Sequence, residues 1–399
     1  MENLYLLLVI VLAVLAIGDL IVGVSNDAVN FLNSAVGSKA ISLRTIMILA
    51  GLGVAFGAFF SSGLMEVARK GIFNPGEFYF DEIILIFTAV MLTDILLLDF
   101  FNTLGMPTST TVSIVFELLG AAVFMSLIKI TSSSGEISDL INYINTSKAI
   151  QIISGIVLSI IVALTIGAIV QWICRIFLTY EFEKKPLWVS VLFSGIALSA
   201  ITYFILMKGI KGTPWAGLKF DIIGGMKIKD FIELEVLKVS ILNFVFWCGL
   251  SYSLIKFFKA NIYKVIIGIG TFALALAFAG NDLVNFIGVP IAAYQSYEAW
   301  ISSGVNASQF SMEAMSAKVP TPAAFLILSG LVMVLTLWFS SKARKVMKTS
   351  LDLSNQGYIK ERFQPSLFSK FIVKFFQKIS VILHDLLPEK LKKKIELVG

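Results

Sequence analysis

Charged residues are scarce in this chain of 399 residues: Asp, Glu, Lys and Arg make up only 15%, while 57% of the residues are hydrophobic. A soluble domain of this length cannot cover so much apolar surface, so the composition excludes that class and indicates a protein that lies in lipid. Cysteine is also rare. Cys174 and Cys248 lie in separate apolar runs with no Cys or His companion nearby, so we interpret both as packing residues rather than redox or metal-binding groups.

Long apolar runs are abundant, and several approach the roughly 20 residues that a helix needs to cross a hydrocarbon core of about 30 Å. They cover residues 4–24, 45–64, 83–104, 111–128, 150–173, 187–207, 240–255, 264–280 and 322–340. The first run follows Glu2 rather than a basic segment, so we expect a retained span and not a signal peptide. The sequence therefore predicts an all-α, polytopic membrane protein.

One short polar pattern occurs twice. Residues 26–31 read Asn-Asp-Ala-Val-Asn-Phe, residues 281–286 read Asn-Asp-Leu-Val-Asn-Phe, and each copy comes after a long apolar run. Matched polar interruptions in two apolar segments are typical of transporters built from two repeats. We expect a first transport repeat over 1–130, middle transmembrane helices and a loop over 131–261, a second repeat over 262–348 and a tail over 349–399.

The distribution of basic residues orients these segments. Clusters at 256–264 and 342–348 are typical of cytoplasmic loops rather than of nucleic-acid contacts. Counting the spans between them gives the two motif copies opposite directions, if 264–295 is one broken helix. The lysine-containing loop 208–235 argues against this orientation, because it would be external. We predict two inverted-topology repeats with discontinuous helices, a helical hairpin near Pro107, and an amphipathic helix near 368–383 that lies in the cytoplasmic interface or packs on the bundle.

The two aspartates of the repeated motif predict cation sites. An ionised carboxylate is costly in hydrocarbon, and neither motif contains a Lys or Arg to pair with Asp27 or Asp282. A bound cation is the natural partner, and neighbouring amide oxygens, with the carbonyls of a broken helix, would complete the all-oxygen ligand set that suits sodium. The alternative is that these Asn and Asp side chains cap half-helices and bond one another across the repeat interface.

A second constellation is the stretch Pro107-Thr108-Ser109-Thr110-Thr111 between two apolar runs. Proline followed by hydroxyl residues is typical of a helix start. Small hydroxyl side chains let an oxyanion approach the free N–H groups of the first turn, where the helix dipole favours negative charge. The stretch thus indicates a phosphate cradle, with an ordinary helix cap as the alternative. Thr321, ahead of a later span, is a fainter counterpart.

These residues resemble the inorganic phosphate transporters of the PiT type, which include sodium-dependent carriers of animals. That family has G-x-N-D-x-x-N in each half, similar to 23–30 in offset form and to 280–285, and P-x-S-T-T-H, similar to 107–112. The resemblance implies phosphate uptake driven by sodium or protons. It also implies two sets of binding residues. The sodium-binding set is Asp27, Asp282, Asn30, Asn285 and Ser25. The phosphate-binding set is Asn26, Asn281, Ser109, Thr110, Thr111 and Thr321.

The sequence departs from that family at three places. Val112 replaces the family histidine, which favours sodium over protons. Residues 51–60 lack the glutamate of animal members. The second P-x-S-T-T-H element is not recognisable after residue 350, so Thr321 or the segment 365–366 replaces it, or the site is asymmetric.

The leading hypothesis is a secondary active symporter of phosphate and sodium in the plasma membrane, working by alternating access. Proton coupling, or another tetrahedral oxyanion such as sulfate or arsenate, is the alternative. An intramembrane enzyme is remote because the sequence has no HExxH or GxSxG motif, and a channel is remote because of the two-fold repeat. The partners are then phosphate, sodium and the bilayer, with a homodimer left open.

Three further acidic residues lie within apolar runs: Asp94, Asp99 and Glu117. They indicate either an additional cation site or hydrogen bonds to neighbouring helices. The single histidine, His384, is far in sequence from the motifs and is given no function.

Overall fold

The structure is a computed structural model, and it describes residues 2–61, 71–179, 182–209, 217–219, 225–313, 321–353 and 366–386. The chain divides into two units, Met1–Leu353 and Ser354–Gly399. The described helices are α1 (Glu2–Ser38), α2 (Leu43–Phe59), α4 (Phe80–Leu104), α5 (Thr110–Ser132), α6 (Leu140–Tyr143), α7 (Thr146–Leu178), α8 (Leu187–Gly209), α9 (Ile228–Leu234), α10 (Val236–Phe258), α11 (Ile262–Ser303), α12 (Ala323–Phe339), α13 (Ser341–Leu353) and α14 (Leu367–Leu386).

The all-α membrane fold is confirmed. Apart from short 3-10 turns and isolated β-bridges, the described secondary structure is α-helical. Seven described helices are long and apolar enough to cross a membrane: α1, α4, α5, α7, α8, α10 and α11. Helices α12 and α13 are long and apolar enough only when taken together, and they are bent by 63° at Ser340, so they form either a broken eighth span or a re-entrant loop. In the second unit, α14 confirms the helix predicted near 368–383, with Phe368 and Phe371 among its exposed apolar side chains.

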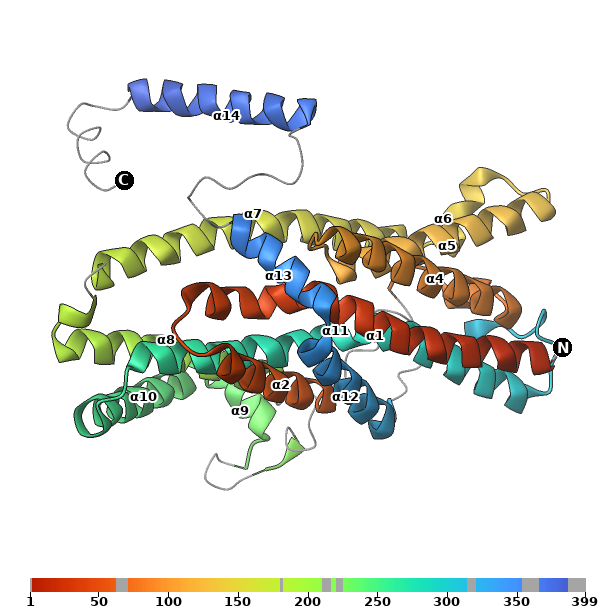
Figure 1. The fold of residues 1–399 in the computed structure, drawn as a ribbon. Coiled ribbons are helices and arrows are strands. Elements are labelled where there is room, and N and C mark those ends of the chain that lie inside the picture. Colours follow the sequence, from red (N-terminus) through yellow and green to blue (C-terminus); the bar gives the residue numbers. More distant parts are fainter. Residues whose placement is uncertain are drawn as a thin grey trace. The chain divides into compact units, whose positions relative to one another are not determined.

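The two copies of the polar motif lie on antiparallel neighbouring helices. Along α1 and α11, Tyr5 meets Trp300 with ring centroids 5.2 Å apart, and Phe31 meets Phe278 at 4.8 Å. The residue number of the contact on α11 falls as the residue number on α1 rises, so the two helices run in opposite directions, as Figure 1 shows. This is the orientation predicted for the motif copies; the inverted relation of the complete repeats stays a prediction.

The predicted helix breaks do not fall at the motifs. α1 continues through residues 26–31 for a total of 37 residues, and α11 continues through 281–286 for 42 residues, with Pro290 inside it. The prediction was wrong there because the polar side chains bond to neighbouring helices while their backbone groups stay within the helix. The discontinuities lie instead at Ser340 and in the turn 105–109 between α4 and α5, which confirms the helical hairpin near Pro107.

Helix α2 approaches α11 backbone to backbone. A Cβ atom added at Gly53 would lie 2.5 Å from the carbonyl oxygen of Phe272, and one added at Gly57 would lie 2.3 Å from that of Leu276. Glycines four residues apart share one face of a helix, and in membranes such faces allow close helix contact. This contact lies on α11 just before the motif at 281–286.

The connections gather at two ends of the first unit. At the end where α1 begins, the N–H of Asn145 donates to the carbonyl of Ile72, and the N–H of Phe80 donates to that of Phe310. At the other end, α13 packs beside α1, and its lysines reach Asp99 and the Thr103 carbonyl near the end of α4. The basic segment 342–348 and the turn 105–109 therefore lie at the same end of the first unit.

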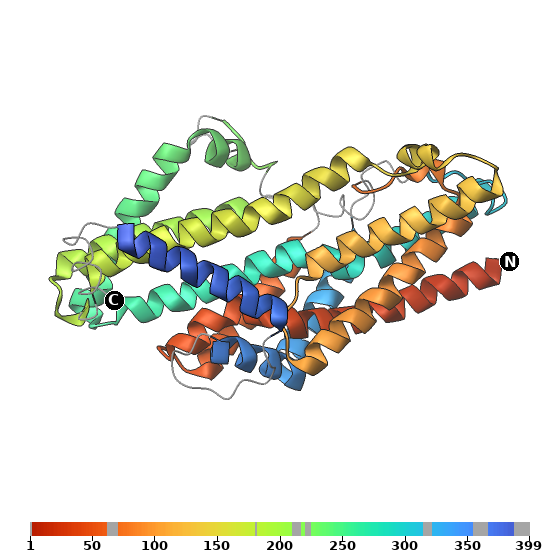
Figure 2. The same cartoon turned by 90° about the horizontal axis from the view of Figure 1, so that it is seen from above.

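Helix α7 is almost unburied within the described structure. None of its apolar window is buried, whereas half of that of α11 is, and Figure 2 shows α7 running along the side of the other helices. Helices α8 and α10 pack against each other, and α8 also packs on α11. The two polar motifs lie on α1 and α11, and their side chains contact α4 and α5.

Candidate functional site

The hairpin turn between α4 and α5 is built by local sequence. Gly105 ends α4 in the left-handed conformation, with φ of 71°, which glycine adopts without a steric penalty. Pro107 follows, and the hydroxyl of Ser109 accepts a hydrogen bond from the N–H of Val112 at 3.3 Å, so Ser109 caps α5. The helix start predicted at this stretch is confirmed, with Thr110 and Thr111 in its first turn.

Asn26 fastens this turn to α1. Its amide nitrogen donates to the side-chain oxygen of Asn102 at 2.9 Å and to the carbonyl of Met106 at 3.1 Å, and its oxygen accepts from the N–H of Thr108 at 2.7 Å. Asn102 in turn donates to the carbonyl of Val22 at 2.7 Å. Asn26 is fully buried, so its amide is occupied by the hairpin.

The two motif aspartates meet at the first turn of α5. Thr110 donates its hydroxyl hydrogen to Asp27 at 2.7 Å, and Thr111, the next residue, donates to Asp282 at 3.2 Å. Carboxylates from antiparallel helices are therefore brought to consecutive residues of a third helix. Neither aspartate forms an ion pair with a Lys or Arg of the described residues.

An asparagine supports each aspartate in the same way. Asn30 donates to Asp27 at 3.0 Å, and Asn285 donates to Asp282 at 3.0 Å. Asn285 also donates to the hydroxyl of Thr111 at 2.9 Å. The spacing N-D-x-x-N thus places the second asparagine one turn beyond the aspartate, on the same helix face.

The two halves of this site differ in accessibility. Asp27 is only 3% exposed, whereas Asp282 and Asn285 are half-buried. Ser109, Thr111 and Asn281 are exposed beside them. The site is therefore a set of oxygen-bearing side chains that is buried around Asp27 and accessible around Asp282.

Ser25 lies at a different helix junction. Its hydroxyl shares a hydrogen bond of 2.7 Å with that of Ser340, at the bend between α12 and α13, and donates to the Ile21 carbonyl at 2.6 Å. Ser340 accepts from the N–H of Ala343 at 3.1 Å and so caps α13. Ser25 therefore faces the start of α13, while Asn26 and Asp27 face the start of α5.

Thr321 is not brought to this cluster. Phe325, near the start of α12, packs against Tyr294, with ring centroids 6.1 Å apart. Tyr294 lies roughly 18 Å along α11 from Asp282, at 1.5 Å per residue. The buried Thr321 hydroxyl has no hydrogen-bond partner in the described structure, and the candidate replacement Pro365 lies outside the described residues.

Sequence reasoning missed two residues of this region. Asn102 is a single amide at the end of an apolar run, where no pattern marks it as the partner of Asn26. Asp19 is the one charged residue within the run 4–24 and is fully buried, which is the signal that could have found it. Of the further acidic candidates, Asp94 is buried beside Ser113, while Asp99 pairs with Lys342.

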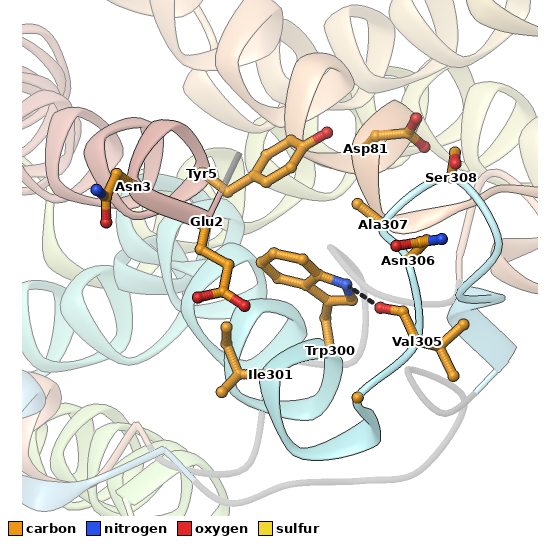
Figure 3. Close-up of a pocket in the computed structure, with 11 residues that line it drawn as sticks. Glu2, Asn3, Tyr5, Asp81, Trp300, Ile301, Val305, Asn306, Ala307 and Ser308 are labelled. Carbon is orange, nitrogen blue, oxygen red and sulfur yellow. Dashed lines mark hydrogen bonds between the residues drawn. The ribbon is translucent and has the colours of Figure 1, made fainter.

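A cavity of the described structure lies elsewhere. It has a volume of about 670 Å³ and is lined by Glu2 and Tyr5 at the beginning of α1, Asp81 at the beginning of α4, Trp300 near the end of α11 and other residues. Figure 3 shows the Tyr5 and Trp300 rings beside it, with the Trp300 indole donating to the Val305 carbonyl. Tyr5 is roughly 33 Å along α1 from Asp27, so this cavity is separate from the motif site.

A bundle of membrane-crossing helices that brings acidic groups from two antiparallel helices to a hydroxyl-rich helix start is typical of a secondary transporter. The model of the phosphate transporter family matches residues 23–350, and the chain belongs to that family. It is therefore a multi-pass membrane transporter and not an enzyme.

Individual relatives agree. Two proteins named "Putative phosphate permease" are similar: that of Thermococcus kodakarensis is 28% identical over 77% of this chain and 68% of its own length, and that of Pyrococcus furiosus is 27% identical over 82% and 71%. A solved structure titled "The sodium-dependent phosphate transporter" has the same fold, with a TM-score of 0.62, 20% identity, and coverage of 86% of this chain and 78% of the other.

Proposed function

We propose that the protein is a secondary active symporter that carries inorganic phosphate together with sodium by alternating access. The observation that supports this most is the meeting of Asp27 and Asp282 at consecutive threonines of α5. The two aspartates belong to helices of opposite direction, and alternating access by two inverted halves needs a shared site between them.

Sodium is the proposed partner of these carboxylates. Asp27 and Asp282 supply negative charge, and Asn30 and Asn285 supply amide oxygen atoms close by on the motif helices. Ser25, the remaining residue of the predicted sodium set, is left out of this proposal because it faces the start of α13. Oxygen ligands without nitrogen or sulfur suit a hard, weakly held cation. Val112 in place of the family histidine, and the name of the solved relative, favour sodium as the coupling ion.

Phosphate is proposed to bind at the start of α5. The first-turn N–H groups and the exposed hydroxyls of Ser109 and Thr111 offer donors, and the helix dipole favours an anion there. Asn281 is exposed beside Asp282 and adds an amide, while Thr110 anchors Asp27. The charge of bound sodium takes the part that an arginine plays in many oxyanion sites.

Besides Thr110, two residues of the predicted phosphate set are not phosphate ligands in this proposal. Asn26 acts by fixing the hairpin turn, because its amide is already occupied. Thr321 is left out, because α12 begins near Tyr294 and not near Asp282. The site is therefore asymmetric, with one hydroxyl-rich helix start serving both aspartates.

The plasma membrane is the proposed location. The chain contains enough apolar helices for a multi-pass protein, and uptake of phosphate from outside needs a carrier there. A homodimer stays a prediction.

Uptake into vesicles tests the proposal. Purified protein in liposomes should accumulate labelled phosphate under an inward sodium gradient, and unlabelled phosphate should compete better than sulfate or arsenate. Asp27→Asn and Asp282→Asn should abolish accumulation, while Glu298→Gln, an exposed acid of α11, should keep it. Absence of sodium-driven accumulation in the unaltered protein would contradict the proposal, and stronger competition by sulfate would assign a different oxyanion.

A further inference from the structure

A line of polar side chains crosses three helices beside the motif site. It consists of Asp19 on α1, Asp94 on α4, and Ser113 and Glu117 on α5, and we name it the carboxyl chain. Asp19 and Asp94 are both 0% exposed, Ser113 is buried and Glu117 is half-buried. The proposed sodium and phosphate sites use none of these four residues.

The two contacts of the Ser113 hydroxyl require a proton on one of the neighbouring carboxyl groups. Its oxygen lies 2.7 Å from Oδ1 of Asp94 and 2.7 Å from Oε1 of Glu117. A hydroxyl has one hydrogen and so can donate to only one of two carboxylates. The second contact is a hydrogen bond only if that carboxyl carries a proton and donates it to Ser113.

Asp19, at the other end of the carboxyl chain, also requires that one carboxyl group of a neighbouring pair carries a proton. Its side chain lies within hydrogen-bonding reach of the Asp94 side chain, yet no donor of the described residues reaches either of its oxygen atoms. The second oxygen of Asp94 is also buried without a donor. Two carboxylates cannot bond to each other unless one holds a proton, and an unpaired buried carboxylate is costly.

The charges around the carboxyl chain do not neutralise it. From α1, Asp27 acts on both Asp19 and Asp94, and it adds negative charge. From α11, Asp282 reaches Asp27 and Thr111. Lys342 of α13 also approaches α4, but its ammonium group pairs with Asp99.

We propose that the carboxyl chain is a proton-binding site within the membrane, which exchanges protons with its surroundings as the carrier moves phosphate. In the arrangement that satisfies every contact, Glu117 donates to Ser113, Ser113 donates to one oxygen of Asp94, and Asp19 donates to the other. Two protons are then shared by three carboxyl groups, and one negative charge remains on Asp94. The part concerning transport rests on the proposed function.

The geometry favours protons over a metal ion at this place. The carboxyl groups of Asp94 and Glu117 are joined through the hydroxyl of Ser113. Among the residues that the structure describes, no three His, Cys, Asp or Glu side chains are grouped so that they could hold a metal ion. The carboxyl chain is also distinct from the pair Asp27 and Asp282, because Asp19 lies about 12 Å along α1 from Asp27.

Infrared spectroscopy of the complete protein in liposomes tests the site without any transport. Protonated carboxyl groups absorb at the C=O stretching frequency, and we expect such a band to titrate with pH and to be reduced by Asp19→Asn. Ser113→Ala should shift the band, whereas Ser126→Ala should leave it unchanged, because Ser126 is buried on the same helix but bonds to the Ala122 carbonyl. A spectrum with no titrating band that Asp19→Asn reduces would overturn the proposal, as would loss of that band when sodium is added at constant pH.

Phosphate uptake tests the exchange. With the sodium gradient held fixed, an inward proton gradient of one pH unit should raise accumulation about tenfold for each proton carried. Asp19→Asn should lose this response and keep sodium-driven uptake. Both proteins are compared at the same pair of pH values, because pH also changes the charge of phosphate. An equal response in both would overturn the exchange, whereas failure of the proposed function would appear as no sodium-driven uptake in either, with the infrared result unaffected.

Discussion

Thr110 and Thr111 are consecutive residues whose hydroxyl groups bind carboxylates from opposite halves of the chain. Thr110 donates to Asp27 at 2.7 Å, and Thr111 donates to Asp282 at 3.2 Å. A movement of the α4–α5 hairpin therefore acts on both aspartates at once. In the proposed mechanism, this coupling gives the two halves a common element that responds to cation and phosphate together.

Replacing Thr110 should weaken sodium dependence more than replacing Thr111. Thr110→Val removes a donor from a carboxylate that is 3% exposed, and an unsatisfied buried group of this kind costs about 1–3 kcal/mol. We expect the sodium concentration for half-maximal uptake to rise about tenfold, which corresponds to about 1.4 kcal/mol. Thr111→Val should have a smaller effect, because Asp282 is half-buried and Asn285 donates to the same oxygen as Thr111, whereas Asn30 donates to the other oxygen of Asp27.

Thr110→Ser provides the matched control, since it keeps the hydroxyl group and loses only a methyl group. Its sodium dependence should stay within about threefold of the unaltered protein, a difference of well under 1 kcal/mol. Equal effects of Ser and Val at this position would show that the hydroxyl contact is not what matters.

Asn26 and Asn102 should act as one structural unit. Each bonds to the other, and together they tie the 105–109 turn to α1. Asn26→Ala or Asn102→Ala should lower the free energy of unfolding by about 1–3 kcal/mol, and the double variant should lose less than the sum. Thermal unfolding in detergent measures this.

The control for this pair is Asn3→Ala, on the same helix but exposed, which should leave unfolding unchanged. If Asn26→Ala lowered phosphate affinity without lowering stability, and Asn102→Ala did neither, Asn26 would be a phosphate ligand and not a support of the turn.

The close approach of α2 and α11 predicts intolerance of side chains at two glycines. Gly53→Ala and Gly57→Ala would each place a Cβ atom within 2.5 Å of a backbone carbonyl oxygen on α11. Overpacking of this kind typically costs about 1–3 kcal/mol, so both variants should unfold at lower temperature. Gly167→Ala in α7, where a Cβ would meet nothing within 4 Å, should not. Equal melting temperatures for all three would contradict the packing.

Much of this architecture follows from sequence patterns. The length of the apolar runs predicts the seven helices that can cross a membrane, although the run 45–64 forms α2, a shorter apolar helix, and the run 322–340 qualifies only together with α13. Pro107 and the hydroxyl residues after it predict the start of α5, and the repeated N-D-x-V-N-F predicts the two aspartate positions. These succeed because each depends on local geometry or on a strong penalty for charge in lipid.

Other features depend on contacts between distant segments and could not be predicted. No sequence signal says that Asn26 meets Asn102, or that Ser25 meets Ser340. The breaks expected at the motifs were misplaced for the same reason: neighbouring helices satisfy the polar side chains, so α1 and α11 have no need to unwind. Asp19 is a different case, since it was missed although its position in an apolar run is a signal of burial.

Coupling of sodium to phosphate is measured by calorimetry of phosphate binding to the purified protein at a series of sodium concentrations. Phosphate affinity should rise with sodium, and Asp27→Asn and Asp282→Asn should each remove this rise even though they belong to different halves of the chain. Phosphate affinity that is the same with and without sodium, or that keeps its sodium dependence in either variant, would contradict this coupling.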